Sequence, residues 1–182
     1  MNDSVHQQIV ISGVGGQGVL FVTRLMAEAA IRKGLPVLTS ETHGMAQRGG
    51  TVISHLKVGD FASPLIRSGH ADLLMAMKAE GAAQHGHYLH EDGWAVVNGG
   101  AGDAAAKDWH RLDADRRAHA IGNPRAVNLV VLGGALAAQG PTPLFCTVED
   151  IRAVLADRLA AKSAMLEMSY KALEAGLHIT DS

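Results

Sequence analysis

The sequence predicts an α/β fold, a three-layer α/β/α, Rossmann-like arrangement around a mostly parallel sheet, with a single domain over residues 1–182. Three observations support this prediction. A β-rich run, a glycine turn and an amphipathic helix follow one another near the N-terminus. Further apolar runs of strand length follow later in the chain. The length suits one α/β domain, which can bury about 70% of the surface of its unfolded chain.

The first predicted unit is a strand, a glycine turn and a helix. The run 8–12 (QIVIS) is β-rich, and 19–31 has the apolar spacing and alanine content of a helix. Gly13, Gly15 and Gly18 between them fit the G-x-G-x-x-G pattern, in which glycine permits a positive φ and close approach of backbone or ligand. The pattern is weak alone. We interpret it as a tight turn without a nucleotide, and contact with a nucleotide or coenzyme A is the alternative.

A second strand is predicted directly after this helix. Gly34 ends the helix and 36–40 (PVLTS) begins a new extended run. We therefore expect a compact β-α-β unit with a right-handed crossover and two parallel strands. Because the carboxyl ends of such strands lie together, the turn 13–18 should lie beside the segment 40–50, at the edge where open α/β sheets usually bind ligands.

The residues of the second turn favour an anion. Arg48 offers a forked guanidinium, Gln47 an amide, and Gly49 and Gly50 leave backbone N–H groups uncovered. The positive end of the preceding helix adds to this character. A phosphate or a partner's carboxylate would fit, and a purely structural role of Arg48 in tying down its loop is the alternative.

We predict a recognition surface with no catalytic residue, because no nucleophile with an obvious base lies in this stretch. Its members contact either a ligand or a subunit: Gly13, Gly15, Gly16, Gln17, Gly18, Gln47, Arg48, Gly49 and Gly50. Glu41 stands where a ribose-binding acid would be expected after the second strand, so an NAD site remains an alternative.

The remaining elements follow from patterning and helix-start signals. Strands are predicted at 51–58, 73–77 and 94–98. Asn123 and Pro124 should start a helix that continues to Ala138.

Two further helices are predicted near the C-terminus. Thr147 to Asp150 resembles a capping box before an apolar helix face, and the last helix should cover 163–175. Gly133 and Gly134 suggest close packing of the preceding helix, and 99–115 is expected to be irregular.

Composition excludes several classes of protein. Sixteen Lys and Arg residues face 18 Asp and Glu residues, and 4% of residues are aromatic, so nucleic acid is not expected as a partner. No signal segment or long apolar span is present, which predicts a soluble cytoplasmic protein without a membrane partner. The single Cys146 can form neither an internal disulfide nor a four-thiolate iron–sulfur cluster.

The histidines do not form a convincing metal set. His85, His87 and His90 lack a cysteine or a tightly placed carboxylate pair, so we expect a solvated helix end and no metal. His43 and His55 are predicted to be loop and strand residues and not catalytic bases.

Four segments in order carry a resemblance to a known family: GVGGQG at 13–18, SETHGMAQRGGTV at 40–52, SPLI at 63–66 and ADLL at 71–74. They resemble the small (beta or gamma) subunit of the 2-oxoacid:ferredoxin oxidoreductases. The MAQRGG turn is most similar to subunit beta of indolepyruvate oxidoreductase. The resemblance resumes at 128–133 and spans most of the chain.

This resemblance implies an accessory subunit that resembles domain III of the single-chain pyruvate:ferredoxin oxidoreductase. In the family, thiamine diphosphate, magnesium and iron–sulfur clusters belong to a large partner subunit. The assembled enzyme decarboxylates an arylpyruvate or other 2-oxoacid onto coenzyme A and passes electrons to ferredoxin. The resemblance implies that this chain supplies assembly and part of the site, and that it is inactive alone. An independent nucleotide- or coenzyme A-binding module is the alternative.

Overall fold

The computed structural model describes residues 5–44, 50–99, 109–138 and 140–178. Six strands form one sheet in the order β2-β3-β1-β4-β5-β6. Their bounds are Gln7–Val14 (β1), Val37–His43 (β2), Thr51–Val58 (β3), Ala71–Ala76 (β4), Leu89–Asn98 (β5) and Trp109–Leu112 (β6). β1, β4, β5 and β6 run parallel, whereas β3 is antiparallel to both of its neighbours.

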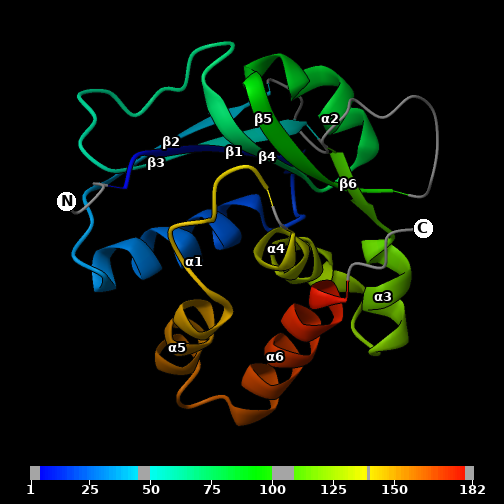
Figure 1. Ribbon diagram of the computed structural model, residues 1–182. Coiled ribbons are helices and arrows are strands. Elements are labelled where there is room, and N and C mark those ends of the chain that lie inside the picture. The colour runs from blue at the N-terminus through cyan, green and yellow to red at the C-terminus, as the bar shows by residue number, and fades with distance from the viewer. Residues whose placement is uncertain (1–4, 45–49, 100–108, 139, 179–182) are drawn as a thin grey trace.

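Helices cover both faces of the sheet (Figure 1). α1 and α4 lie against one face, with α5 and α6 farther from the sheet on the same side, and α2 lies on the opposite face. The helices are Val19–Arg32 (α1), Ala79–His85 (α2), Ala114–Ala120 (α3), Val127–Ala137 (α4), Val148–Arg158 (α5) and Ser163–Leu177 (α6). Short 3-10 turns are Gly86–Tyr88 (η1) and Pro124–Ala126 (η2).

Two apolar cores result from the alternation of side chains along the strands. On β1, Ile9 and Ile11 pack into the larger core with α1, α4 and α5. Val10 points to the other face and joins a smaller core beneath α2. Every one of these three side chains is fully buried. β1 is therefore a central strand that both helical layers cover, as the uninterrupted apolar run at its centre predicts.

The prediction that β1 and β2 are adjacent parallel strands of a β-α-β unit is wrong. β1 and β2 do run in the same direction, but β3 lies between them and pairs antiparallel with each. The reason is local. β2 and β3 are joined by a short connection, so they close as a hairpin, and β3 then fills the position beside β1.

The prediction that residues 99–115 are irregular is also wrong in part. This stretch contains β6 and the start of α3. The side chain of Asp113 caps α3 by accepting a hydrogen bond from the Arg116 amide at 2.9 Å. The sequence signals for this helix were the Asp before an Ala- and Arg-rich run, whereas four residues are too few to predict a strand by periodicity.

The positions of the other predicted elements are confirmed, but the Asn123 side chain makes no capping hydrogen bond. The run 51–58 is β3 as predicted, the last helix begins at Ser163, and α4 follows a 3-10 turn that starts at Pro124. The close packing predicted at Gly133 is real, because a Cβ there would overlap the carbonyl oxygen of Leu173 on α6.

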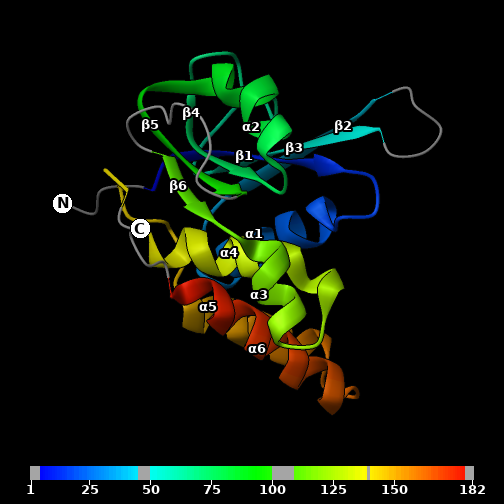
Figure 2. The same ribbon diagram turned by 90° about the vertical axis from the view of Figure 1, so that its right-hand side faces the viewer.

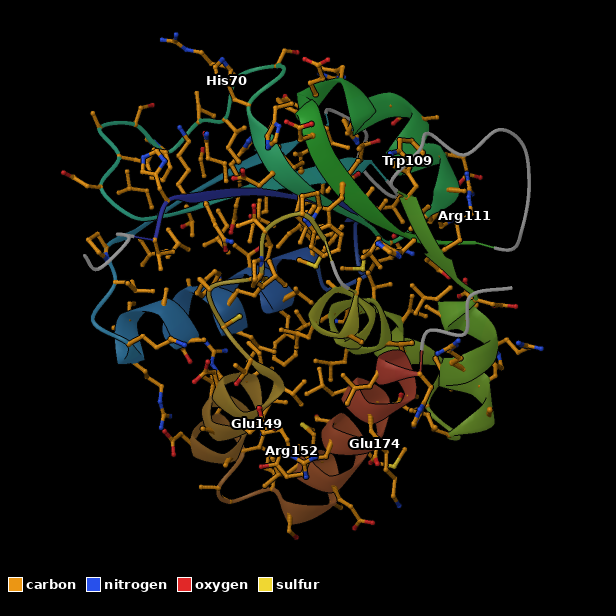
Figure 3. The ribbon with its side chains drawn as sticks, in the orientation of Figure 1. His70, Trp109, Arg111, Glu149, Arg152 and Glu174 are labelled. Carbon is orange, nitrogen blue, oxygen red and sulfur yellow. The ribbon has the colours of Figure 1, made fainter. Side chains whose placement is uncertain are left out.

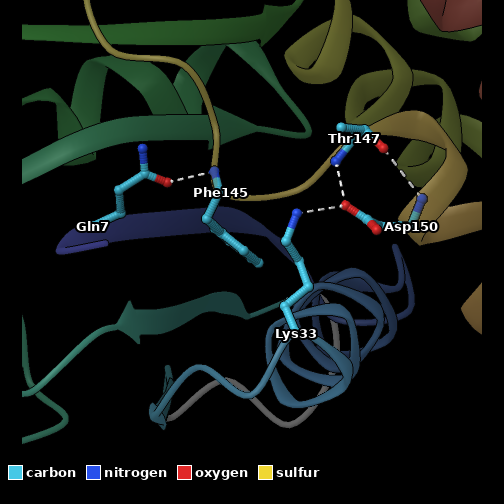
Figure 4. Close-up of polar contacts among 5 residues, drawn as sticks. All are labelled: Gln7, Lys33, Phe145, Thr147 and Asp150. Atoms are coloured by element: carbon cyan, nitrogen blue, oxygen red, sulfur yellow. Dashed lines mark hydrogen bonds and ion pairs between the residues drawn. The ribbon is translucent and has the colours of Figure 1, made fainter. Parts of the chain in front are cut away.

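The start of α5 is held by a capping box (Figure 4). The amide of Asp150 donates to Thr147 Oγ1 at 3.3 Å, and the amide of Thr147 donates to Asp150 Oδ2 at 2.9 Å. Lys33 at the end of α1 reaches the same carboxylate at 3.0 Å. Partial burial works to raise the pKa of Asp150, but the hydrogen bond from Thr147 and the contact with Lys33 outweigh it and lower the pKa. This contact joins α5 to α1.

The expectation of a solvated histidine end is wrong for His85. It is 7% exposed, and a 2.8 Å hydrogen bond joins its Nδ1 to Ser12 Oγ on β1. His87 is exposed, and His90 contacts Asp72 at 3.2 Å. His55 is a buried strand residue, as predicted. Over the described ranges, no helix is long and apolar enough to cross a membrane.

Candidate functional site

The two turns of the sequence prediction meet at one edge of the sheet. Val52 at the start of β3 pairs with Gly13 on one side and with His43 on the other. The ends of β1 and β2 therefore flank the beginning of the same strand. The predicted convergence is confirmed, although β3 brings it about and not a direct pairing of β1 with β2.

A hydrogen bond joins the two turns. The amide of Gly15 donates to the carbonyl oxygen of Gly50 at 3.0 Å. Beside it, the amide of Gly44 donates to the carbonyl of Thr51 at 2.8 Å and closes the β2–β3 hairpin. Gln47, Arg48 and Gly49 lie outside the described residues, so their predicted roles remain predictions.

Glycine is needed at different positions of the first turn for different structural reasons. Gly18 has φ 77°, and a Cβ there would overlap Nδ2 of Asn128 on α4. At Gly13 a Cβ would lie 2.7 Å from Cγ2 of Val19. Gly16 has φ 90°, is exposed, and would meet nothing within 4 Å. Packing explains Gly13 and Gly18, whereas only backbone conformation explains Gly16.

The side chain of Gln17 serves the turn itself. Its Oε1 accepts a hydrogen bond from the Val14 amide at 2.9 Å, and its Nε2 points to the carbonyl of Met77 at 3.5 Å. The amide is thus engaged on both sides within the protein. Gln17 thus links the turn to the end of β4.

The backbone amides at the start of α1 favour an anion at this edge. No side chain caps α1, and its first turn has no acidic residue. The N-cap residue Gly18 therefore offers no side-chain acceptor to the first amides of the helix, which lie at the positive end of its dipole. Gly15 and Gly16 beside them are exposed. The arrangement suits a phosphate or a carboxylate.

Asn128 belongs to this edge, and the sequence analysis missed it. It is 8% exposed at the start of α4, and its Nδ2 donates to the carbonyl of Gly18 at 3.4 Å. The contact places the N-termini of α1 and α4 next to each other. The only available signal was a polar residue at the start of an otherwise apolar helix.

The described part of the chain offers little reactive chemistry. No group of three or more His, Cys, Asp or Glu residues there could hold a metal ion. Cys146 is buried, and this burial raises the pKa of its thiol to about 12, so it is protonated at neutral pH.

The topology argues against an NAD site at Glu41. Glu41 is level with Ser54 on β3, which is level with Ile11 on β1. Glu41 therefore precedes the end of β2 and lies two strands away from β1, a distance of about 10 Å. In a Rossmann site the acid follows the strand directly beside the glycine turn.

Known proteins share both the sequence pattern and the fold. Indolepyruvate oxidoreductase subunit IorB of Archaeoglobus fulgidus is 46% identical over 90 residues, which are 50% of this chain and 45% of that protein. The chain thus spans about half the length of that relative in this alignment. The IorB subunit of Thermococcus kodakarensis is 29% identical over 194 residues, with 93% of both chains covered.

Solved structures extend the comparison. The gamma subunit of keto/oxoacid ferredoxin oxidoreductase from Geobacter sulfurreducens superposes with a TM-score of 0.74 at 25% identity, covering 94% of this chain and 96% of that one. The 2-oxoglutarate:ferredoxin oxidoreductase of Magnetococcus marinus, solved with 2-oxoglutarate, coenzyme A and succinyl-CoA, shares the fold with a TM-score of 0.77 at 19% identity. The superposition covers 97% of this chain and 32% of the Magnetococcus marinus chain.

The family assignment rests on nearly the whole chain. A sequence model described as pyruvate ferredoxin/flavodoxin oxidoreductase matches residues 8–179, which include every strand but the first residue of β1 and all six helices. The chain therefore belongs to the pyruvate ferredoxin/flavodoxin oxidoreductase family.

Proposed function

We propose that this chain is the small subunit of a 2-oxoacid:ferredoxin oxidoreductase that acts on indolepyruvate or a related arylpyruvate. The observation that carries the proposal is the hydrogen bond between Gly15 and Gly50, which joins the two glycine-containing turns that carry the resemblance at one edge of the sheet. The similarity to proteins named indolepyruvate oxidoreductase supports the substrate. We expect the complex to be cytoplasmic.

In this proposal a large partner subunit carries the redox chemistry. Thiamine diphosphate, magnesium and iron–sulfur clusters would reside there, and the single cysteine of this chain cannot supply the four thiolates of a cluster. The complex decarboxylates the 2-oxoacid, transfers the acyl group to coenzyme A and passes the released electrons to ferredoxin. Coenzyme A bound in the Magnetococcus marinus enzyme supports its role as co-substrate.

The role of this chain is to dock on the partner and complete its site. The exposed backbone at Gly16 and the amides at the start of α1 would receive a carboxylate of the large subunit or a phosphate of coenzyme A. Arg48 would supply the charge from the neighbouring turn. Gly13, Gln17 and Gly18 would hold the turn in shape.

Reconstitution tests the proposal. The chain is co-expressed with a thiamine-binding large subunit, and reduction of ferredoxin is measured with indolepyruvate, pyruvate, 2-oxoglutarate and 2-oxoisovalerate, each with and without coenzyme A. We expect a stable complex, coenzyme A-dependent turnover greatest with indolepyruvate, and no turnover by either subunit alone. Failure to associate, or turnover by the lone chain, would contradict the proposal.

Titration separates this proposal from an independent binding module. The lone chain is titrated with coenzyme A and with NAD by calorimetry. We expect no measurable heat, because in this proposal the large subunit is needed to complete the site. Tight binding of either compound to the lone chain would favour the module instead.

A further inference from the structure

A loop joins β3 to β4 on the same side of the sheet as α2 (Figure 1, Figure 2). It comprises residues 59–70, contains neither helix nor strand, and carries the SPLI segment at 63–66. Leu65 in this segment is 53% exposed, whereas the next residue, Ile66, is 3% exposed. The loop has no ladder or helix of its own, so its conformation depends on the contacts that it makes with the rest of the chain.

Several of these contacts are insensitive to pH. The side chain of Ile66 packs into the smaller core beneath α2. At the end of the loop, the amide of Gly69 donates to the carbonyl of His87 at 2.9 Å, and the amide of His70 donates to the carbonyl of Tyr88 at 2.8 Å. His70 itself is exposed on the outer surface (Figure 3). Apolar packing and bonds between backbone groups do not involve a titrating atom.

The contact of the loop with His55 is different. The amide of Ile66 donates to Nδ1 of His55 on β3 at 3.4 Å. His55 is 2% exposed, and its ring meets the ring of Tyr88 edge-on, with the centroids 5.3 Å apart. Because an amide N–H can only donate, Nδ1 must be unprotonated and the ring proton must be on Nε2. A second proton on the ring would occupy Nδ1 and remove the acceptor.

Positive groups surround the His55 ring. Burial, followed by the charges of Lys57 on β3 and His85 on α2, lowers the pKa of His55. Burial, followed by the charge of Arg67 in the loop, lowers the pKa of Lys57 in turn. His87 on η1 is exposed to solvent. A proton on His55 would therefore place a further positive charge in a desolvated and already cationic part of the molecule.

The neighbouring strands do not compensate this charge. The residues level with His55 are Val10 on β1 and Ser40 on β2, and neither side chain ionises at physiological pH. Asp72 on β4 makes its own contact with His90 at 3.2 Å. The described groups whose charges act on the pKa of His55 include no carboxylate. Protonation of His55 in the closed structure is therefore unfavourable.

We propose that His55 and Ile66 form a latch that holds the loop 59–70 on the sheet at neutral pH and releases it in mild acid. In the latched form, neutral His55 accepts the hydrogen bond of the Ile66 amide. When Nδ1 takes up a proton from solvent, this amide loses its acceptor inside an apolar core, and the loop opens so that both groups reach water. The SPLI segment therefore keeps its conformation only while His55 is neutral.

The direction of the pH dependence follows from the two forms. In the open loop His55 is hydrated and takes up a proton near its ordinary pKa of 6.5, whereas in the latched form it stays neutral to a lower pH. The equilibrium constant for opening is therefore independent of pH above 6.5. Below 6.5 it rises by up to about tenfold per pH unit, until the pKa of the latched form is reached.

Hydrogen exchange of the Ile66 amide in the purified full-length chain tests the latch. We expect its protection factor, corrected for the intrinsic exchange rate at each pH, to fall about tenfold between about pH 7.5 and about pH 5.5. The amide of Ile11 at the buried centre of β1 reports global unfolding and should be better protected at both pH values. Equal protection of the two amides, or a protection factor of Ile66 that does not change with pH, would overturn the proposal.

Two variants assign the change to His55. His55→Asn keeps an acceptor oxygen near the position of Nδ1 but cannot take up a proton, so the protection factor of Ile66 should no longer depend on pH. His85→Gln is the matched control, because this buried histidine bonds to Ser12 and not to the loop, and it should retain the fall of about tenfold. The same pH dependence in His55→Asn as in the parent chain would contradict the latch.

The state of the ring gives a test that needs no variant. Long-range proton–nitrogen NMR of the parent chain should show His55 at neutral pH with its proton on Nε2 and a bare Nδ1. A proton on Nδ1 at neutral pH would overturn the proposal. All of these measurements use the chain without the large subunit, so the latch and the proposed function can fail independently.

Discussion

At the scale of single residues, glycines of similar conformation in one turn have different tolerances. Gly16 and Gly18 both have positive φ, but only Gly18 is pressed against a neighbour, the amide of Asn128. The G-x-G-x-x-G spacing identified the turn without revealing this difference, because the contact comes from a helix more than a hundred residues later.

Replacing these glycines by alanine should separate strain from packing. Gly16→Ala should cost about 1–2 kcal/mol of unfolding free energy from left-handed strain alone. Gly18→Ala adds an overlap with Asn128 and should cost about 2–4 kcal/mol. Urea unfolding of both variants at neutral pH measures the difference, and equal losses would show that the Asn128 contact carries no energetic weight.

The buried histidines make stability depend on pH. Burial lowers the pKa of His55 and of His85 below the ordinary 6.5, and the nearby Lys57 and His87 respectively lower it further, whereas a backbone contact with Gly81 works to raise that of His85. In the unfolded chain both histidines take up protons as the pH falls through 6.5, whereas in the folded chain they stay neutral to a lower pH. Stability is therefore complete above pH 6.5 and declines below it toward the folded-state pKa values.

This decline can be assigned by substitution. Between about pH 6.5 and pH 5, each histidine that stays neutral contributes a loss of up to about 1.4 kcal/mol per pH unit. The double variant His55→Gln, His85→Gln should flatten the profile, and the exposed His87→Gln should leave it largely unchanged. Urea unfolding across this range measures both. Glu28 and Asp150, whose pKa values are lowered, act only in more acidic solution. An unaltered slope in the double variant would contradict the assignment.

At the scale of elements, the crossing of α4 and α6 shows that the absence of side chains lets two helices approach closely. A Cβ at Gly133 would overlap the carbonyl of Leu173, and one at Gly176 would overlap the carbonyl of Val130. The two backbones thus meet without side chains between them. At Gly134, by contrast, the nearest neighbour of a Cβ would be the end of the Leu112 side chain at 3.2 Å, and none of its three nearest atoms belongs to the backbone.

Adjacent alanine substitutions test this close approach. Gly133→Ala should lower the free energy of unfolding by about 2–4 kcal/mol, because the helices must separate. Gly134→Ala should stay within about 1 kcal/mol of the parent, since the better helix propensity of alanine offsets a small clash. Chemical denaturation with far-UV circular dichroism measures both. Comparable stability of the two variants would mean that the helix crossing adjusts freely.

At the scale of the whole molecule, the exposed edge at Gly15 and Gly50 should matter only in the assembled enzyme. We predict that Arg48→Ala lowers affinity for the large subunit or turnover of the complex by at least about tenfold, through loss of a charged contact. Arg116→Ala, an exposed arginine on α3, is the control and should change neither. Unchanged affinity and turnover of Arg48→Ala would remove Arg48 from the site.

Local sequence signals determined a large part of this molecule. The glycine turn, the capping box at Thr147, the strand 51–58 and the limits of α1 are set by residues within a few positions of each other. Short-range hydrogen bonds and side-chain periodicity are sufficient for such features. The meeting of the two turns was predicted correctly, but the sequence indicated only that β1 and β2 run in the same direction and not that β3 lies between them and joins their ends.

Only the tertiary structure decided which elements become neighbours. The insertion of β3 beside β1, the burial of His85 against Ser12, and the contact of Asn128 with Gly18 all join residues distant in sequence. A strand's alternation indicates which side chains are buried but does not name the strand or helix that covers them. That choice depends on which packing of the whole chain leaves the fewest apolar and polar groups unsatisfied.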